Sequence, residues 1–280
     1  MLITNRTDAP MVYNSGIIYM KKYFVILSVL VLTVFCGCKK DAGEPITREF
    51  GDGGSYTELE VSDAFDVTVS DAVNQITVTA GKNVMPNVVV ERVGDELIIR
   101  LKAFSGNYKN SEMKVVLPYN ANLRSVELSG SAHFNSTYGL SGHDVDVDLS
   151  GSSEFVCDIA AEEADIDLTG ASKMKANVIA GKLDLEMYGA SEATLTGQVS
   201  KMDMDLYEAS DIIKTVSGTR YGLAVGECEG TMLGASNAYI HSDGSIQVNL
   251  WGASDLHYTG EASTSGSYTY GGSNIIHDNL

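Results

Sequence analysis

Carboxylate side chains recur at a fixed spacing and are the most regular chemical feature of this chain. Asp148, Asp167, Glu186 and Asp205 lie nineteen residues apart, and a second acidic set lies two residues earlier in each repeat. If the repeats stack, these carboxylates lie about 4.8 Å apart and repel each other unless water, salt or a cation intervenes. The pattern therefore predicts either a solvated acidic face or a weak Ca²⁺ site, and no other cofactor. The candidate metal ligands are Asp146, Asp148, Asp165, Asp167, Asp184, Glu186, Asp203 and Asp205.

The chain carries none of the short motifs that mark common catalytic sites. Gly-x-Ser-x-Gly, His-Glu-x-x-His, the phosphate-binding Gly-x4-Gly-Lys pattern and the dinucleotide-binding glycine pattern are all absent. The residues from Asp144 to Asp148 have the spacing of a calcium loop, but Leu149 stands where such a loop needs glycine. No catalytic residue is assigned, and we expect the protein not to be an enzyme. A carbohydrate-active enzyme is the less favoured alternative.

Large side chains replace small ones at one outward position of the repeat. The position holds Ser129, Ser150 and Thr169 in early copies and becomes aromatic or large from the fourth copy onward. Such a row predicts a platform for sugar rings or a partner protein, unless it is only an external ladder that covers the sheet. A longer repeat after Glu208 adds a loop that we expect beside this row, where it could supply selectivity. The candidate ligand-binding residues are Tyr188, Tyr207, Trp251, Tyr270, Arg220 and Tyr221.

Eight copies of a short pattern define the elements that carry these side chains. Each copy reads as an apolar residue, any residue, usually glycine, and two small residues, and it recurs every 18 to 26 residues, which indicates stacked coils. Before the glycine, apolar and polar residues alternate as in a half-buried strand. The leading apolar residue, the glycine and the serine are expected to face inward. The predicted fold is all-β, a right-handed parallel β-helix or β-solenoid with coils of about 19 residues and a non-repeat β-rich N-terminal part.

The N-terminal region has the features of an exported lipoprotein. Lys21 and Lys22 precede an apolar run, residues 23–35, that is too short to span a membrane. Gly37 before Cys38 resembles a bacterial lipobox, so Cys38 is the expected lipidation site; ordinary secretion with another cleavage site is the alternative. The predicted division is a signal peptide at 1–37 with its true start at Met20, a lipid-anchored flexible tether at 38–55, a β-rich cap at 56–120 and the repeat at 121–280.

The net charge limits the classes of binding partner, and the positions of the cysteines indicate their chemical state. The net charge of −18 argues against nucleic acid and against direct attraction to an anionic membrane surface, so only the lipid should hold the protein to a membrane. Cys157 and Cys228 occupy different positions in their repeats. We expect them to be buried free thiols rather than a disulfide.

Four short segments, in order, carry a family resemblance: Phe65-Asp66-Val67-Thr68-Val69, Asp95-Glu96-Leu97-Ile98-Ile99-Arg100, Val115-Val116-Leu117-Pro118 and Leu128-Ser129-Gly130-Ser131. Together they resemble the putative auto-transporter adhesin head GIN domain family, typical of Bacteroidetes envelope lipoproteins. The resemblance implies a β-helical protein of the cell envelope, anchored to the outer membrane on its periplasmic or outer side, and transfers no catalytic residue. We predict a non-enzymatic adhesin whose lateral face binds a glycan or a protein at the cell surface. The alternative is a structural or signalling accessory without its own ligand.

Overall fold

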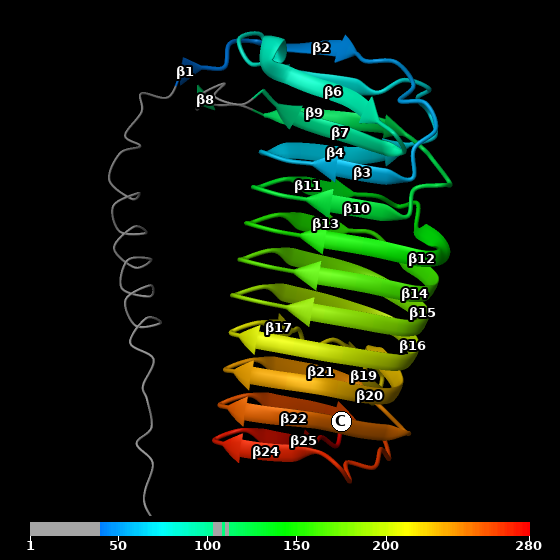
Figure 1. Ribbon diagram of the computed structural model, residues 1–280, viewed down its shortest axis with the longest axis vertical. Coiled ribbons are helices and arrows are strands. Elements are labelled where there is room, and N and C mark those ends of the chain that lie inside the picture. Colours follow the sequence, from blue (N-terminus) through cyan, green and yellow to red (C-terminus); the bar gives the residue numbers. More distant parts are fainter. Residues whose placement is uncertain (1–39, 103–107, 110–111) are drawn as a thin grey trace, which may run out of the picture. The chain divides into compact units, whose positions relative to one another are not determined.

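Strands paired in parallel, one coil above the next, make up most of the chain (Figure 1). The computed structural model describes residues 40–102, 108–109 and 112–280, and the architecture is that of the unit Asp41–Leu280. Apart from the single 3-10 turn η1 (Met85–Asn87), the described residues hold no helix. The predicted all-β class is confirmed.

The repeat contains strands that follow one another around each coil. Their bounds are β10 (Ser125–Leu128), β11 (His133–Asn135), β12 (Leu140–Leu149), β13 (Glu154–Val156), β14 (Ile159–Leu168), β15 (Lys173–Met187), β16 (Glu192–Glu208), β17 (Asp211–Ile212), β18 (Val216–Ser217), β19 (Arg220–Tyr221), β20 (Leu223–Gly234), β21 (Asn237–His241), β22 (Ser245–Gly252), β23 (Asp255–Thr259), β24 (Tyr268–Gly271) and β25 (Asn274–His277).

The coils pair along three faces, always in parallel and in register. Face 1 aligns the C-terminal parts of β12, β14, β15 and β16, so that Asp148 lies beside Asp167. Face 2 aligns β13 with the start of β15 and β16, and there Phe155 lies beside Met174. Face 3 aligns the N-terminal parts of β12 and β14 with the middle of β15, which places Ile159 beside Val178. One residue of a coil is therefore repeated at the same place in the next coil.

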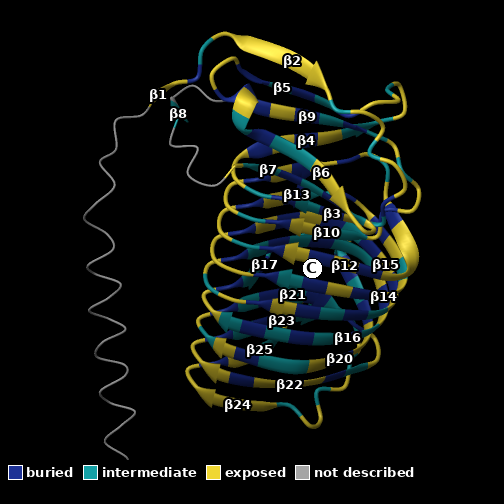
Figure 2. Ribbon diagram, turned by 45° about the horizontal axis from the view of Figure 1, so that its top comes forward, coloured by how far each residue is buried: buried dark blue, intermediate teal, exposed yellow. Residues whose placement is uncertain are grey.

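Alternation along each strand separates the core from the surface (Figure 2). On face 1, Leu183, Leu185 and Met187 are fully buried, whereas Asp184 and Glu186 between them reach the surface. The serine that follows each turn is buried as expected, from Ser153 to Ser254. Apolar side chains and these small hydroxyls thus fill the interior of the stack, which contributes the main stabilising term through buried apolar area.

The turn glycines do not face inward, contrary to expectation. Gly130, Gly151 and Gly170 are exposed and have positive φ angles of 74°, 75° and 79°. A Cβ atom on Gly170 would lie 2.7 Å from the carbonyl oxygen of Gly151, which also accepts a hydrogen bond from the Ala171 backbone. Backbone conformation and the close approach of stacked turns require glycine here, rather than a lack of space in the core.

The N-terminal part joins the stack and covers one end of it. Its strands are β1 (Lys40–Asp41), β2 (Pro45–Glu49), β3 (Glu58–Val61), β4 (Phe65–Ser70), β5 (Thr77–Gly81), β6 (Val88–Val93), β7 (Glu96–Leu101), β8 (Tyr108–Lys109) and β9 (Met113–Pro118). Strands β3 and β4 pair in parallel with β10 and β11 on one side and with β7 and β9 on the other. From β2 at the outer end, the chain therefore runs to β3 and β4 beside the repeat, goes outward again through β5, β6, β7 and β9, and then enters the repeat at β10.

Antiparallel pairing closes this end. Strand β6 pairs with β7, β5 pairs with β9, and β2 pairs with β5. Residues 45–49 were expected to be part of a flexible tether, but they form β2, because their backbone completes the edge of β5 and Thr47 and Thr79 share a hydroxyl hydrogen bond of 2.7 Å. Strand β2 is then the edge strand of this end, and its short length, its Pro45 and its charged Arg48 and Glu49 discourage pairing with other chains.

Candidate binding surface

The outward row of large side chains forms one continuous feature, which we call the aromatic stripe: Tyr188, Tyr207, Leu233, Trp251 and Tyr270. Tyr207 is aligned with Leu233, Leu233 with Trp251, and Trp251 with Tyr270. Each of the first four residues follows the last buried residue of a face 1 strand, so the pleat turns its side chain outward, and Tyr270 lies in β24, whose residues are all exposed. Trp251 is 42% exposed and Tyr270 47% exposed, and Tyr207 is half-buried between its neighbours.

Ring stacking orders the stripe. The ring centroids of Tyr188 and Tyr207 are 4.5 Å apart with an interplanar angle of 8°, and those of Trp251 and Tyr270 are 4.0 Å apart at 11°. These separations are close to the strand spacing of about 4.8 Å, so the coils themselves set the ladder. Stacked rings turn their faces toward each other and present their edges outward. Leu233 separates the two stacked pairs.

A polar trough borders the stripe at Tyr188. Its volume is about 310 Å³, and Ser150, Thr169, Asp148 and Asp167 contribute hydroxyl and carboxylate groups to its lining. Burial raises the pKa of Asp167 to about 6, and the charges of Asp148 and Glu186 add to this effect. Asp167 also forms a side-chain hydrogen bond with Asp148, so this pair holds a proton more tightly than separate carboxylates would.

The candidate metal ligands come together on face 1 as the sequence indicated. Asp146, Asp165, Asp184 and Asp203 are aligned in one column, and Asp148, Asp167, Glu186 and Asp205 are aligned in the other. Lysines lie among them: Lys182 Nζ is 2.5 Å from Asp184 Oδ2 and 3.0 Å from Glu163 Oε1, and Lys201 pairs with Glu229. Within residues 40–102, 108–109 and 112–280, no group of three or more His, Cys, Asp or Glu side chains is arranged to hold a metal ion.

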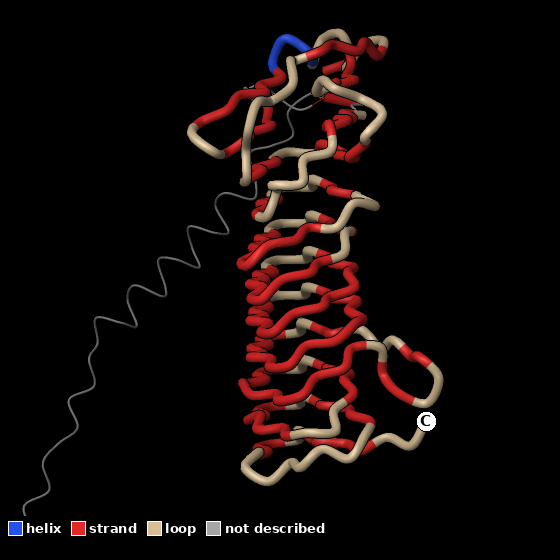
Figure 3. The backbone as a smooth tube through the Cα atoms, turned by 90° about the vertical axis from the view of Figure 1, so that its right-hand side faces the viewer, coloured by secondary structure: helices blue, strands red, loops and turns tan. Residues whose placement is uncertain are grey.

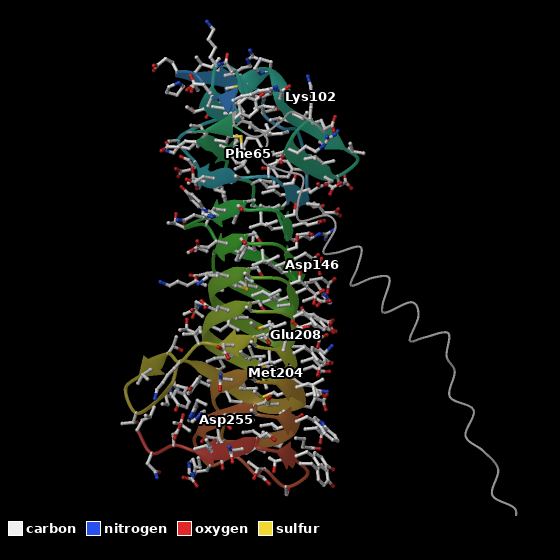
Figure 4. All side chains as sticks on the ribbon, turned by 90° about the vertical axis from the view of Figure 1, so that its left-hand side faces the viewer. Phe65, Lys102, Asp146, Met204, Glu208 and Asp255 are labelled. Atoms are coloured by element: carbon white, nitrogen blue, oxygen red, sulfur yellow. The ribbon has the colours of Figure 1, made fainter. Side chains whose placement is uncertain are left out.

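The loop that carries Arg220 and Tyr221 is not beside the stripe. It forms the antiparallel hairpin β18–β19, which projects from the stack near the C-terminus (Figure 3). The labelled Asp146 and Glu208 lie toward the other side of the stack (Figure 4). In β16, Tyr207 of the stripe lies six positions after Lys201 at the start of face 1, a distance of about 20 Å along an extended strand. The structure therefore places Arg220 and Tyr221 away from the aromatic stripe, although the sequence predicts them beside it.

Tyr221 anchors the hairpin instead of facing solvent. It is fully buried, its backbone N–H donates to Thr259 Oγ1 at 3.1 Å, and its hydroxyl donates to Asp278. Its ring meets Tyr239 edge-on at 5.5 Å, and Lys214 Nζ lies 5.4 Å from the ring centre. Burial, followed by the hydrogen bond to Asp278, raises the pKa of Tyr221. The phenol thus stays neutral and acts as a donor.

Neither described cysteine is placed for nucleophilic chemistry. Cys157 and Cys228 are buried free thiols, as expected. Burial raises the pKa of Cys157 to about 11 and that of Cys228 to about 12, so both are protonated near neutral pH and unreactive. Cys38, the expected lipidation site, lies outside the described residues. The part of the chain that the structure describes holds no helix long and apolar enough to cross a membrane.

The architecture belongs to the class of repeat proteins in which stacked β coils present continuous lateral surfaces. The chain is a member of the family described as "Putative auto-transporter adhesin, head GIN domain", whose model matches residues 55–262. The predicted family is thereby confirmed. No curated protein matches the chain.

Solved structures from Bacteroidetes share the fold. A putative adhesin from Parabacteroides merdae is 18% identical with a TM-score of 0.74, and the match covers 86% of this chain and 98% of that one. A putative lipid binding protein from Parabacteroides distasonis is 17% identical with a TM-score of 0.74, covering 86% and 99%. A putative adhesin from the same organism is 21% identical with a TM-score of 0.69, covering 86% and 97%. At these identities the likeness concerns the fold alone.

Proposed function

We propose that this protein is a non-enzymatic adhesin of the cell envelope that holds its partner on the aromatic stripe. The observation that carries the proposal is the continuity of the stripe over successive coils, with Tyr188, Leu233, Trp251 and Tyr270 each more than two-fifths exposed. Large contiguous apolar patches on soluble proteins commonly mark interaction sites. The family name and the descriptions of two similar structures as adhesins agree with this proposal.

The geometry of the stripe favours a protein partner. Sugars pack on the open faces of aromatic rings, whereas the Tyr188–Tyr207 and Trp251–Tyr270 pairs turn their faces toward one another. Ring edges, phenol hydroxyls and Leu233 suit the mixed apolar and polar contacts of a protein interface. A glycan is the second candidate, and the trough beside Tyr188 supports it, because hydroxyl and carboxylate groups there could bind sugar hydroxyls.

A double variant, Tyr207→Ser with Trp251→Ser, tests the stripe. Binding of the purified protein is measured on arrays of extracellular-matrix proteins and of glycans, together with a thermal melt. We expect binding to fall at least tenfold while the fold is kept, because each exposed cross-strand pair contributes only about 0.2–1 kcal/mol to stability. The control is Tyr119→Ser, which removes an exposed ring of the N-terminal part that lies tilted against Tyr138. Unchanged binding by the double variant would make the stripe a structural covering.

The anchor and the winding are proposals as well. We propose a signal peptide at 1–37, acylation of Cys38 and a location at the outer membrane, supported by the apolar run and the lipobox-like Gly37. The β-rich part at 56–120 would then cap the repeat at 121–280. We also propose that the coils wind as a right-handed β-helix, because crossovers between parallel strands of one sheet are almost always right-handed.

A further inference from the structure

The hairpin β18–β19 is the one large departure from regular coil length in the repeat part that the structure describes. The spacing from Glu208 to Gly234 is 26 residues, against 18 to 21 elsewhere in the repeat. The extra residues are held firmly, because Tyr221 is buried against Tyr239 and bonded to Thr259 and Asp278. His257 Nδ1 also lies 2.9 Å from Asp278 Oδ2. Hydrogen bonds from Tyr221 and His257 outweigh the effect of burial and lower the pKa of Asp278, which keeps it charged.

This anchoring places Arg220 at a groove. The groove has a volume of about 680 Å³ and follows the corner where face 3 leads into face 1. Its floor is formed where three successive coils carry small residues, Ser200, Gly226 and Gly244. In earlier coils the same corner carries Glu162, against which the Gly181 backbone packs. From Gly181 onward this corner carries only small residues, and the hairpin projects beside the last three of them.

Some charged side chains of the groove have a side-chain or backbone partner in the described residues, and others have none. Arg220 forms no ion pair within the described part of the chain, whereas Lys201 pairs with Glu229. Asp243 is engaged as well, since its Oδ1 accepts the Glu261 backbone N–H at 3.0 Å and its Oδ2 lies 3.4 Å from His241 Nε2. Glu227 lines the groove as an acceptor without a bonded side chain in the described residues. The groove is thus lined by one guanidinium, of Arg220, and one carboxylate, of Glu227, that have no side-chain partner in the described residues.

We propose that this groove is a second binding site, separate from the stripe, for a sugar unit that carries a carboxylate. The planar guanidinium of Arg220 would hold the carboxylate through paired N–H donors. Glu227, Gln198 and Ser200 would bind the sugar hydroxyls, and the glycine floor lets the ring approach the backbone. The cavity volume lies within the range of small-ligand sites, about 300–1,000 Å³.

Two acidic oligosaccharides and their uncharged counterparts test the proposal by titration calorimetry. The probes are trigalacturonate and sialyllactose, each with its own methyl ester. We expect at least one acid to bind and its uncharged counterpart to bind at least tenfold more weakly. Arg220→Ala should weaken the binding of that acid by about tenfold to a hundredfold, the value of a lost charged hydrogen-bond pair. Arg220→Lys keeps the positive charge but lacks the paired N–H donors of the guanidinium, so it should recover only part of the affinity.

Arg48→Ala is the matched control, because it removes an exposed arginine from β2 at the capped end of the stack. It should bind like the parent, and thermal melts should show that both alanine variants are folded. Failure of both acids to bind, equal binding of an acid and its uncharged counterpart, or full affinity in Arg220→Ala would overturn the proposal. None of these results bears on the stripe, because Tyr207 and Trp251 remain in every variant.

Discussion

Gly151, Gly170 and Gly189 lie directly above one another, each with its backbone against the carbonyl oxygen of the preceding turn. Their positive φ angles and this contact explain why the repeat keeps glycine at an exposed position. Glu208 occupies the next place in the column and has a φ of 66°, one of two positive values found for non-glycine residues in the described part of the chain. A side chain at this φ costs about 1–2 kcal/mol relative to glycine.

Two substitutions in this column should have opposite effects. Gly170→Ala should lower the free energy of unfolding by about 1–3 kcal/mol, because its φ is 79° and the new Cβ would lie 2.7 Å from the Gly151 carbonyl oxygen. Glu208→Gly should be neutral or stabilise the fold by about 1 kcal/mol, since relief of strain is partly offset by greater freedom of the unfolded chain. Urea denaturation of both variants measures this. A stable Gly170→Ala protein would contradict the role of the turn.

The pKa of Asp167 makes stability depend on pH. Its value of about 6 in the folded protein lies above about 4 for an unfolded aspartate, so the folded state binds the proton more tightly. The contribution of Asp167 to stability is therefore present below about pH 4 and is lost as the pH rises through about 6. The melting temperature should rise as the pH falls from 7.5 to 5, and less so in Asp167→Asn. Asp95→Asn, the same change in an exposed turn, should keep the full rise; equal rises in all three proteins would count against the pair.

At the scale of elements, the sequence repeat predicts the strands that belong to the repeat but not those outside it. The alternation of Leu183 to Met187 gives the strand, its inner side and its alignment with the next coil, because a shift by one residue would bury carboxylates. The N-terminal strands lack the period, so their order in space, with β3 between β7 and β10, could not be deduced. The direction of the β18–β19 hairpin depends on Tyr221, Thr259 and Asp278, which come together only in the folded chain.

Neighbouring residues of β15 test the assigned sides of face 1. Leu185→Asp should destabilise the fold by more than about 4 kcal/mol, because Leu185 is 1% exposed and a buried charge would have no partner. Asp184→Ser is the matched control on the outer side; it should change stability little, because Lys182 keeps its contact with Glu163. Thermal melts compare the two variants with the parent. Equal losses would mean that the inner and outer sides are assigned wrongly.

At the scale of the whole molecule, the stack separates surfaces that lie close in sequence. Strand β16 carries Lys201 at the groove and Tyr207 in the stripe, at opposite ends of face 1. The stripe could be predicted, because one outward position repeats from coil to coil. The groove could not, because its floor of Ser200, Gly226 and Gly244 faces the hairpin only after the coils stack. The proposed sites could therefore hold two ligands at once.

Attachment to the membrane should depend on one cysteine. If Cys38 is acylated, Cys38→Ser should move the protein from the membrane fraction to the soluble fraction, because lipid chains and not a chain of net charge −18 supply the affinity. Cys36→Ser is the matched control; it changes the same atom two residues earlier and should leave the protein on the membrane. Fractionation of cells grown with labelled palmitate measures both effects. Label in Cys38→Ser, or none in the parent, would exclude Cys38 as the anchor, and an unlabelled parent released from the cells would favour ordinary secretion.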